Sequence, residues 1–248
     1  EATSHAQHID ELFFNVHSEN IQGVRDYLQR HSTKLADCQH PDSGQTILHW
    51  LAENASQQNT RMPSTEFIQE LIVLGAPINS FDKTGWSPLL VATKNGNVAL
   101  TYVFLQEGAD PTPRLPGEIS SLHLLAASAS AKDSSICAAV FSKLAAVIGV
   151  NSTTSRRETP LHFAIAGNTT SVVVDILLQL GADPNIIDET GETPLMLAVR
   201  RGSSSMVAKL LSAGALVTKK TSSLAKTRKL KSQLKNHQME KVSKYIDI

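Results

Sequence analysis

The chain has 248 residues, of which 41% are hydrophobic and 19% charged, an ordinary composition for a folded chain. Its 23 basic and 23 acidic residues cancel to a net charge of zero. The sequence has no run of about 18 or more apolar residues, which excludes a membrane-spanning helix.

The first predicted elements are two short amphipathic helices. Apolar residues recur at helical spacing in residues 9–17 and again in residues 21–30. Each segment therefore has one apolar face and one polar face. We expect residues 6–34 to form a helix pair at the N-terminal end of the fold.

A short motif then recurs along the chain, and its clearest copy reads Thr159-Pro160-Leu161-His162. A nearly constant period of this length indicates a repeat protein in which each unit is one supersecondary element. The first residue of each copy, always Thr or Ser, falls at Thr46, Ser87, Ser120, Thr159 and Thr193, so the copies are 41, 33, 39 and 34 residues apart.

Each copy carries the start and stop signals of a helix pair. The hydroxyl of Thr159 can cap the first helix by accepting from backbone N–H groups, and Pro160 follows at the first helical position, where no N–H is needed. A second apolar stretch, residues 172–178, is followed by Gly181, which suits the left-handed residue that closes a helix. Residues 188–191 then supply a tight turn before the next pair.

With its period near 33 residues and its Thr-Pro-Leu-His core, the sequence resembles the ankyrin-repeat family. The resemblance implies an all-α solenoid of stacked helix-turn-helix units with short β-turn hairpins. We expect residues 1–217 to form the array, with N-terminal cap helices in residues 6–34 and about five repeats in residues 35–217. Extra length lies near residues 56–63 and 128–135, and the third inter-repeat turn is irregular because it contains Pro111, Pro113 and Pro116.

Residues 218–248 differ from the rest of the chain in charge. They contain nine Lys and Arg against Glu240 and Asp247, a net charge of +7 that leaves −7 for residues 1–217. One interpretation is a nuclear-localisation signal or an acidic-partner surface around Arg228-Lys229-Leu230-Lys231. The other is a degenerate capping repeat with a polar outer face. Its buried side would come from Leu224, Met239, Val242, Tyr245 and Ile246.

The sequence contains no recognisable catalytic or metal-binding constellation. His49, His123 and His162 occupy the same position of the motif, so the period spreads them along the stack. We expect each imidazole to bond backbone groups and to tie its repeat to the next turn. His5 and His8 have no Cys or carboxylate partner at ligand spacing. We therefore expect no enzyme activity, no cofactor, no metal and no small-molecule substrate.

The resemblance implies recognition of a protein partner on a concave surface, formed by the turn tips and the exposed face of each first helix. Trp86 is the strongest candidate, because an exposed Trp is unusual and Trp is enriched at binding hot spots. Basic residues on this face of an acidic body favour a partner with an acidic segment. The candidate partner-binding residues are Phe81, Lys83, Trp86, Lys94, Asn95, Arg156, Arg157, Glu192, Arg200 and Arg201, and further free positions are Gln45, Glu53, Asn54, Thr84, Glu158 and Glu189.

Three functions fit this pattern. The first is a protein-binding adaptor or scaffold domain. The second is an inhibitory regulator of a transcription factor, similar to the NF-κB inhibitors or the fungal cell-cycle ankyrin proteins. The third is a pathogen effector acting on a host protein. Nucleic acid is not an expected partner, because the basic tail lacks interleaved aromatics beyond Tyr245.

The two cysteines bear on localisation. Cys38 and Cys137 are isolated and give no disulfide framework. That usage suits a reducing compartment. We expect an intracellular protein, in the cytoplasm or nucleus, or one delivered into a host cell.

Overall fold

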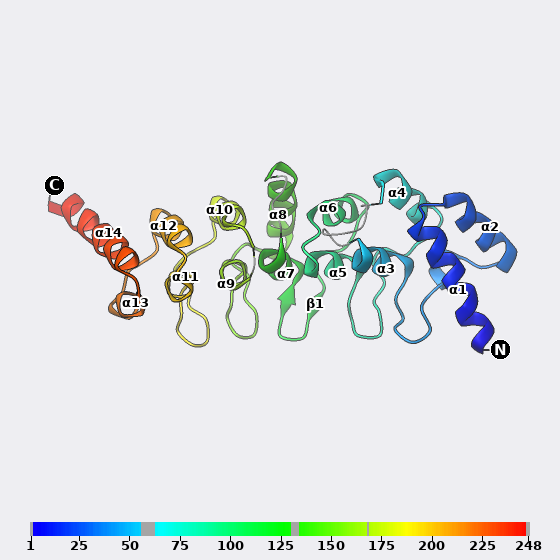
Figure 1. Cartoon of the computed structure of the whole chain (residues 1–248), viewed down its shortest axis with the longest axis horizontal. Helices are drawn as coiled ribbons and strands as arrows, with labels where there is room; N and C mark the ends of the chain where they lie inside the picture. The colour runs from blue at the N-terminus through cyan, green and yellow to red at the C-terminus, as the bar shows by residue number, and fades with distance from the viewer. Residues whose placement is uncertain (1, 56–62, 130–133, 168, 247–248) are drawn as a thin grey trace.

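The computed structural model describes residues 2–55, 63–129, 134–167 and 169–246, and the side chains of residues 10–239 within these ranges. In these ranges the chain forms helices that follow one another in pairs, with one two-stranded hairpin in the middle (Figure 1). The predicted all-α repeat architecture is therefore confirmed.

The elements in chain order are α1 (Ala2–His17), α2 (Ile21–His31), the 3-10 helix η1 (Leu35–Asp37), α3 (Ile47–Asn54), α4 (Thr65–Val73), α5 (Pro88–Lys94), α6 (Val98–Gln106), β1 (Arg114–Leu115), β2 (Ile119–Ser120), α7 (Ser121–Ser128), α8 (Ser134–Ile148), α9 (Pro160–Ala166), α10 (Ser171–Gln179), α11 (Pro194–Arg201), α12 (Ser204–Ser212), α13 (Lys219–Leu224) and α14 (Arg228–Ile246). The inserted segments near residues 56–63 and 128–135 lie mostly outside the described residues.

The helix pairs stack along one axis, with the chain termini at opposite ends (Figure 1). The first helix of each pair contacts the first helix of the next pair, in the order α1, α3, α5, α7, α9, α11 and α13. The second helices of the pairs form another row. The turns between pairs project from the first-helix side (Figure 1). Each pair therefore rests mainly on the pairs before and after it, as in other repeat proteins.

One apolar core runs through the stack, because the same motif positions are buried in each unit. Small residues at these positions let neighbouring first helices approach closely. Gly167, just after α9, marks one such close approach: a Cβ there would lie 2.1 Å from the carbonyl oxygen of Ala127 on α7. The motif leucines Leu48, Leu89, Leu122, Leu161 and Leu195 are at most 1% exposed, and Ala52, Ala92, Ala126, Ala164 and Ala198 are fully buried.

The proline-rich third turn forms the hairpin of β1 and β2. Leu115 pairs with Ile119 in antiparallel register. At its tip Gly117 and Glu118 have φ angles of 85° and 61°. Two successive left-handed residues match the twist of a tight hairpin, so the irregular turn is nevertheless well formed.

The C-terminal helices α13 and α14 pack on the preceding pair, but one predicted buried side chain is wrong. Met239 is 61% exposed. Instead Leu230 and Leu234, four residues apart, are 1% and 2% exposed and lie on the helix face that contacts α12. Helix α14 begins at Arg228, and its first turns carry Leu230 and Leu234 into the packed face, whereas Met239 lies on an exposed part of the helix. Leu224 is half-buried, and the side chains of Val242, Tyr245 and Ile246 lie outside the described part.

Candidate protein-binding surface

Five inter-repeat turns, which we name fingers, line the first-helix side of the stack (Figure 1). In finger 2 the N–H of Asp82 donates to the carbonyl of Trp86 (2.9 Å), and the Asp82 carboxylate accepts from the N–H groups of Thr84 and Trp86. Asp188 holds finger 5 in the same way. The fingers are finger 1 (residues 40–45), finger 2 (82–86), finger 3 (the hairpin 114–120), finger 4 (154–158) and finger 5 (188–192).

These hydrogen bonds also set the charge state of the turn aspartates. Burial alone would raise the pKa of Asp82, but hydrogen bonds from Thr84 and from the Trp86 N–H outweigh burial and lower it. The pKa of Asp188 is lowered by equivalent bonds from Glu192 and Thr190 against the same effect of burial. In fingers 2 and 5, one oxygen of the turn carboxylate is therefore committed to holding the turn.

Three buried histidines tie repeats together, as predicted. Nδ1 of His49 accepts from the backbone N–H of Thr46 (3.1 Å), which leaves the Nε2–H to donate to the carbonyl of Trp86 in the next finger (2.9 Å). His162 repeats this arrangement with the carbonyl of Glu192, and His123 with those of Ser152 and Glu158. Burial lowers the pKa of all three rings, that of His123 to about 4. They are neutral structural groups.

Successive fingers are also joined directly. The Lys83 N–H donates to Ser43 of finger 1 (2.9 Å), and the Lys83 ammonium donates to the Pro41 carbonyl (2.6 Å). Ser155 of finger 4 donates to Gly117 of finger 3 (2.9 Å). The Arg156 guanidinium pairs with Glu189 of finger 5 at 2.6 Å. Lys83 and Arg156, two predicted binding residues, therefore also hold the row of fingers together.

The junction between fingers 2 and 3 lacks both kinds of tie. Leu90 takes the place of the histidine in the second unit. All residues of both fingers are described, and no hydrogen bond joins finger 2 to finger 3. Their ribbons stand farther apart than those of the other neighbouring fingers (Figure 1). The row is therefore interrupted at this point, on the C-terminal side of Trp86.

Trp86 and Lys94 come together beside this junction. The Lys94 ammonium lies 4.9 Å from the centroid of the Trp86 ring, a cation–π distance. Trp86 is half-buried and packs partly against the core, so its ring is less exposed than the sequence suggested. Phe81, which directly precedes finger 2, is 51% exposed. An apolar surface with one flexible cation thus remains accessible at the base of finger 2.

Two other predicted residues carry structural contacts. The amide of Asn95 donates to the carbonyl of Ala52 on α3 (3.0 Å). Arg201 donates to the carbonyls of Ala166 and Gly167 at the end of α9 (3.2 Å to Gly167). The assumption that the fold leaves Asn95 and Arg201 free is therefore wrong, because both complete the hydrogen bonding of a preceding first helix.

Arg200 and Glu192 form an ion pair at 2.7 Å. The Arg200 side chain is 53% exposed and that of Glu192 13%. Arg200 lies on α11, three first-helix steps from α5. At 8–10 Å for each step, it lies about 27 Å from Lys94. The fold therefore places Trp86 with Lys94, and Arg200 with Glu192, at separate positions along one surface.

The remaining candidates have local partners or lie at a turn tip. Gln45 donates to Glu53 (2.9 Å), and Asn54 donates to the carbonyl of Trp50 (2.9 Å). Thr84 bonds to Asp82, and the Glu158 carbonyl accepts from His123. Arg157 is exposed at the tip of finger 4, with a φ of 60°.

The middle of this surface has a feature that the sequence reasoning missed. Ala127 on α7 and Ala166 on α9 occupy the motif position of Lys94 on α5 and Arg200 on α11, seven residues after each helix cap. A low, uncharged strip therefore separates the two cationic positions. An alignment of the motif copies would have revealed this strip, because comparing the residue seven positions after each cap shows Ala in two units and Lys or Arg in the others named here.

Two negative findings hold for the described part of the chain. No three His, Cys, Asp or Glu side chains gather there in a way that could hold a metal ion. No helix there is long and apolar enough to cross a membrane.

Comparison with known proteins agrees with this fold. A family model for ankyrin repeats (3 copies) matches residues 122–221. The Escherichia coli (strain K12) ankyrin repeat protein YahD is 32% identical over 154 residues, which cover 60% of this chain and 73% of that protein. The crystal structure of the ankyrin repeat domain of Bcl-3, a unique member of the IkappaB protein family, matches with a TM-score of 0.66 at 20% identity, covering 91% of this chain and 97% of that domain.

The chain belongs to the ankyrin-repeat family, whose fold is generally a non-catalytic scaffold for protein–protein interaction. Longer relatives match through their repeats. Protein lin-12 of Caenorhabditis elegans is 31% identical over 104 residues, which cover 42% of this chain and only 7% of lin-12. Human Rabankyrin-5 is 31% identical over 161 residues, covering 58% of this chain and 12% of that protein.

Proposed function

We propose that this chain is a non-catalytic binding module that holds a partner protein on its finger face, meaning the fingers together with the exposed side of the first helices. The observation that carries this proposal is the pairing of Trp86 with Lys94 beside the interrupted junction of fingers 2 and 3. Trp is the residue type most enriched at binding hot spots, and a partly buried ring is already held in place before the partner arrives.

The chemistry of the surface suits an extended, acidic partner segment. Lys94 presents a cation over an aromatic ring, and among the described residues it has no carboxylate partner. The strip of Ala127 and Ala166 lets a partner backbone approach α7 and α9 closely. From Trp86 to Arg200 the segment would span about 27 Å, three helix steps, which requires about eight extended residues.

The test uses captured proteins from cell extract and compares four versions of the chain. These are the parent, Trp86→Ala, Lys94→Ala and the control Tyr102→Ala, which removes a 36% exposed aromatic ring from the second-helix row. Partners of the finger face should be retained by the parent and the control and lost from Trp86→Ala. For a partner identified in this way, Trp86→Ala should weaken binding by about 2 kcal/mol or more.

Equal melting temperatures of the variants show that any loss reflects the surface and not the fold. The proposal fails if the captured set is the same for Trp86→Ala and for Tyr102→Ala.

We place this recognition inside the cell, because Cys38 and Cys137 are both buried free thiols.

The alternative function, an inhibitory regulator of a transcription factor, has the likeness to Bcl-3 in its favour. At 20% identity that likeness concerns the fold alone. No described residue favours a pathogen effector. The identity of the captured partner separates these roles: a transcription factor supports the regulator, and a host protein from a different species supports the effector.

A further inference from the structure

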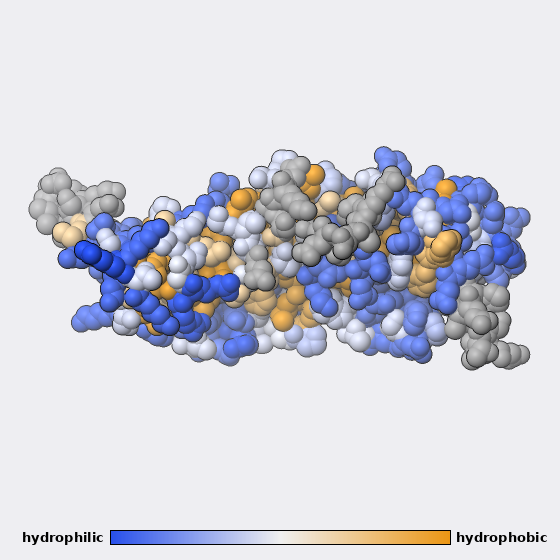
Figure 2. Space-filling model, in the orientation of Figure 1, coloured by the Kyte–Doolittle hydropathy of each residue, from blue (hydrophilic) through white to orange (hydrophobic). Residues whose placement is uncertain are grey.

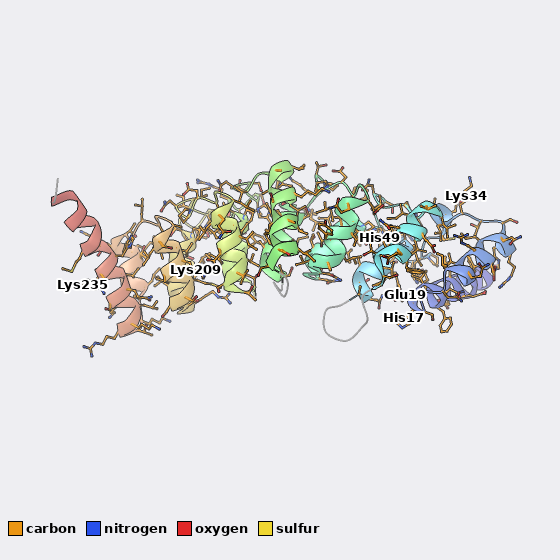
Figure 3. The ribbon with its side chains drawn as sticks, turned by 90° about the horizontal axis from the view of Figure 1, so that it is seen from above. His17, Glu19, Lys34, His49, Lys209 and Lys235 are labelled. Atoms are coloured by element: carbon orange, nitrogen blue, oxygen red, sulfur yellow. The ribbon has the colours of Figure 1, made fainter. Side chains whose placement is uncertain are left out.

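The C-terminal end of the stack carries a dense group of exposed cations. From Thr193 to Met239 the sequence contains no Asp or Glu. Strongly hydrophilic side chains cover this end of the molecule (Figure 2). Lys235 on α14 lies at the same end of the stack (Figure 3). We name this surface the C-terminal basic face, and it consists of Lys219, Lys220, Lys226, Arg228, Lys229, Lys231 and Lys235, all of them exposed.

The packing of this end does not require these charges. Helix α14 is held by the opposite side, through buried Leu230 and Leu234 and through a hydrogen bond from Gln233 to the carbonyl of Ser204 on α12 (3.3 Å). Helix α13 is capped by the hydroxyls of Thr218 and Thr221. The C-terminal pair can therefore dock on the stack whatever the charge of its outer side.

The positions of the cations are unfavourable for the helices that carry them. Lys219 and Lys220 open α13, and Arg228 and Lys229 open α14, where the positive end of the helix dipole disfavours a cation. Lys231 and Lys235 are four residues apart, a spacing at which like charges repel. A cap that only needed to be soluble could carry carboxylates at these helix starts. Because α13 and α14 have no carboxylates at their starts, we infer that the positive charge serves a purpose other than solubility.

Elsewhere in the described chain, several cations are neutralised by nearby carboxylates. Arg30 pairs with Glu11, Arg156 with Glu189 and Lys209 with Asp175. Within the described side chains, none of the seven cations of the basic face forms such a pair. Among the described residues, the one side-chain hydrogen bond made by these ammonium and guanidinium groups is from Lys220 to the carbonyl of Gly191 in finger 5 (3.4 Å). The basic face is thus an uncompensated positive surface.

We propose that the C-terminal basic face binds an acidic segment of the partner protein, as an extension of the finger-face recognition on which this inference rests. The bond from Lys220 to finger 5 makes the two surfaces continuous. Helix α13 is one step beyond α11 in the first-helix row, so about three more extended residues carry a segment from Arg200 onto the basic face.

An acidic protein segment fits better than nucleic acid. The described side chains of residues 218–239 include no Phe, Tyr or Trp ring on which a base could stack, and six of the seven cations are Lys. A long polyanion would also meet the net charge of −7 on residues 1–217, whereas a short acidic segment touches only the basic face.

The experiment measures binding of a labelled peptide of eight consecutive glutamates to the full chain, by fluorescence anisotropy at low salt. Lys231→Glu/Lys235→Glu should weaken binding at least tenfold. The matched control Arg25→Glu/Lys34→Glu changes the net charge equally at exposed positions of the N-terminal end and should weaken binding less than threefold. Binding by the parent should also fall as salt rises, because the charges are exposed.

The result overturns the proposal if the peptide does not bind the parent or if both double variants weaken binding equally. It is also overturned if a DNA duplex binds the parent more tightly than the peptide does. Tyr102→Ala, in the second-helix row and outside both surfaces, should leave peptide binding unchanged. Failure of the finger-face proposal and failure of the basic-face proposal are therefore measured by different variants. Circular dichroism of each variant verifies folding.

Discussion

The guanidinium of Arg201 on α11 donates a hydrogen bond of 3.2 Å to the carbonyl oxygen of Gly167, one repeat earlier at the end of α9. It also donates to the carbonyl of Ala166. The last carbonyls of a helix have no partner within it, so a side chain from the next repeat completes α9. An arginine that the sequence suggests for partner binding thus holds two units together.

Replacing Arg201 should therefore cost more stability than replacing its neighbour Arg200. Arg201→Ala leaves two carbonyls of α9 without their charged donor and should lower the free energy of unfolding by about 1–2 kcal/mol. Arg200→Ala breaks an exposed ion pair with Glu192 and should cost at most about 1 kcal/mol. Urea denaturation of both variants makes the comparison, and equal losses would contradict a capping role for Arg201.

Arg157 should be replaceable by glycine with a gain in stability. Its φ is 60°, whereas the equivalent residues of fingers 2 and 5 are Gly85 (84°) and Gly191 (72°). The left-handed conformation costs a non-glycine residue roughly 1–2 kcal/mol, partly offset by the greater freedom of glycine in the unfolded chain. Arg157→Gly should therefore raise the free energy of unfolding by about 0.5–1 kcal/mol, as measured by thermal unfolding.

The opposite change, Gly191→Ala, serves as the control and should destabilise by a similar amount. A lower melting temperature for Arg157→Gly would mean that the arginine makes a stabilising contact that outweighs its backbone strain.

Stability should fall between pH 6.5 and pH 4 because of the buried histidines. Burial lowers the pKa of folded His123 to about 4, below its ordinary value of 6.5, so in this interval the unfolded chain binds the proton more readily. The contribution of neutral His123 is complete above pH 6.5 and is lost as the pH falls towards 4, up to about 3 kcal/mol. His49 and His162 act in the same direction.

Urea midpoints measured from pH 4 to pH 7.5 test this dependence. His123→Gln, which cannot take up the proton, should have a shallower dependence over the same range although it is less stable at pH 7. A parent whose midpoint does not change between pH 6.5 and 4.5 would show that these rings are not buried neutral groups.

Leu161 should behave as a core residue of the fourth unit. It is 1% exposed, so Leu161→Ala removes buried methyl groups and leaves a cavity that should cost roughly 2–5 kcal/mol. Leu216→Ala is the control, since Leu216 is 58% exposed and should change stability by less than about 0.5 kcal/mol. An unchanged melting temperature for Leu161→Ala would mean that this part of the stack is not formed in solution.

The third unit should open before the fourth and fifth. Residues 111–150 follow the interrupted junction of fingers 2 and 3, where Leu90 replaces a histidine tie. In a stack stabilised by neighbour interfaces, the weakest interface opens first. Native-state hydrogen exchange should find lower protection in residues 111–150 than in residues 155–215. Uniform protection over both ranges would show that the helix contacts alone compensate for the missing finger bonds.

The period of the motif determined the architecture, because each repeated signal has a local physical effect. Thr159 caps a helix, Pro160 starts it, and Leu161 lies on the face of that helix that the next units bury. The histidine ties could be predicted as well, since a histidine at a fixed motif position meets the same backbone carbonyl of the next unit. Local signals repeated at a constant interval thus sufficed for the fold.

The tertiary structure alone decided which surface residues are committed to the fold. Arg200 and Arg201 are adjacent in sequence, yet one forms an exposed ion pair and the other caps α9, because a turn of about 100° separates their directions on α11. The contact of Lys94 with Trp86 and the interruption after finger 2 likewise depend on how neighbouring units are placed. Apart from Leu90, which marks the missing histidine tie, these contacts join residues that share no local pattern, so the sequence by itself carries no signal for them.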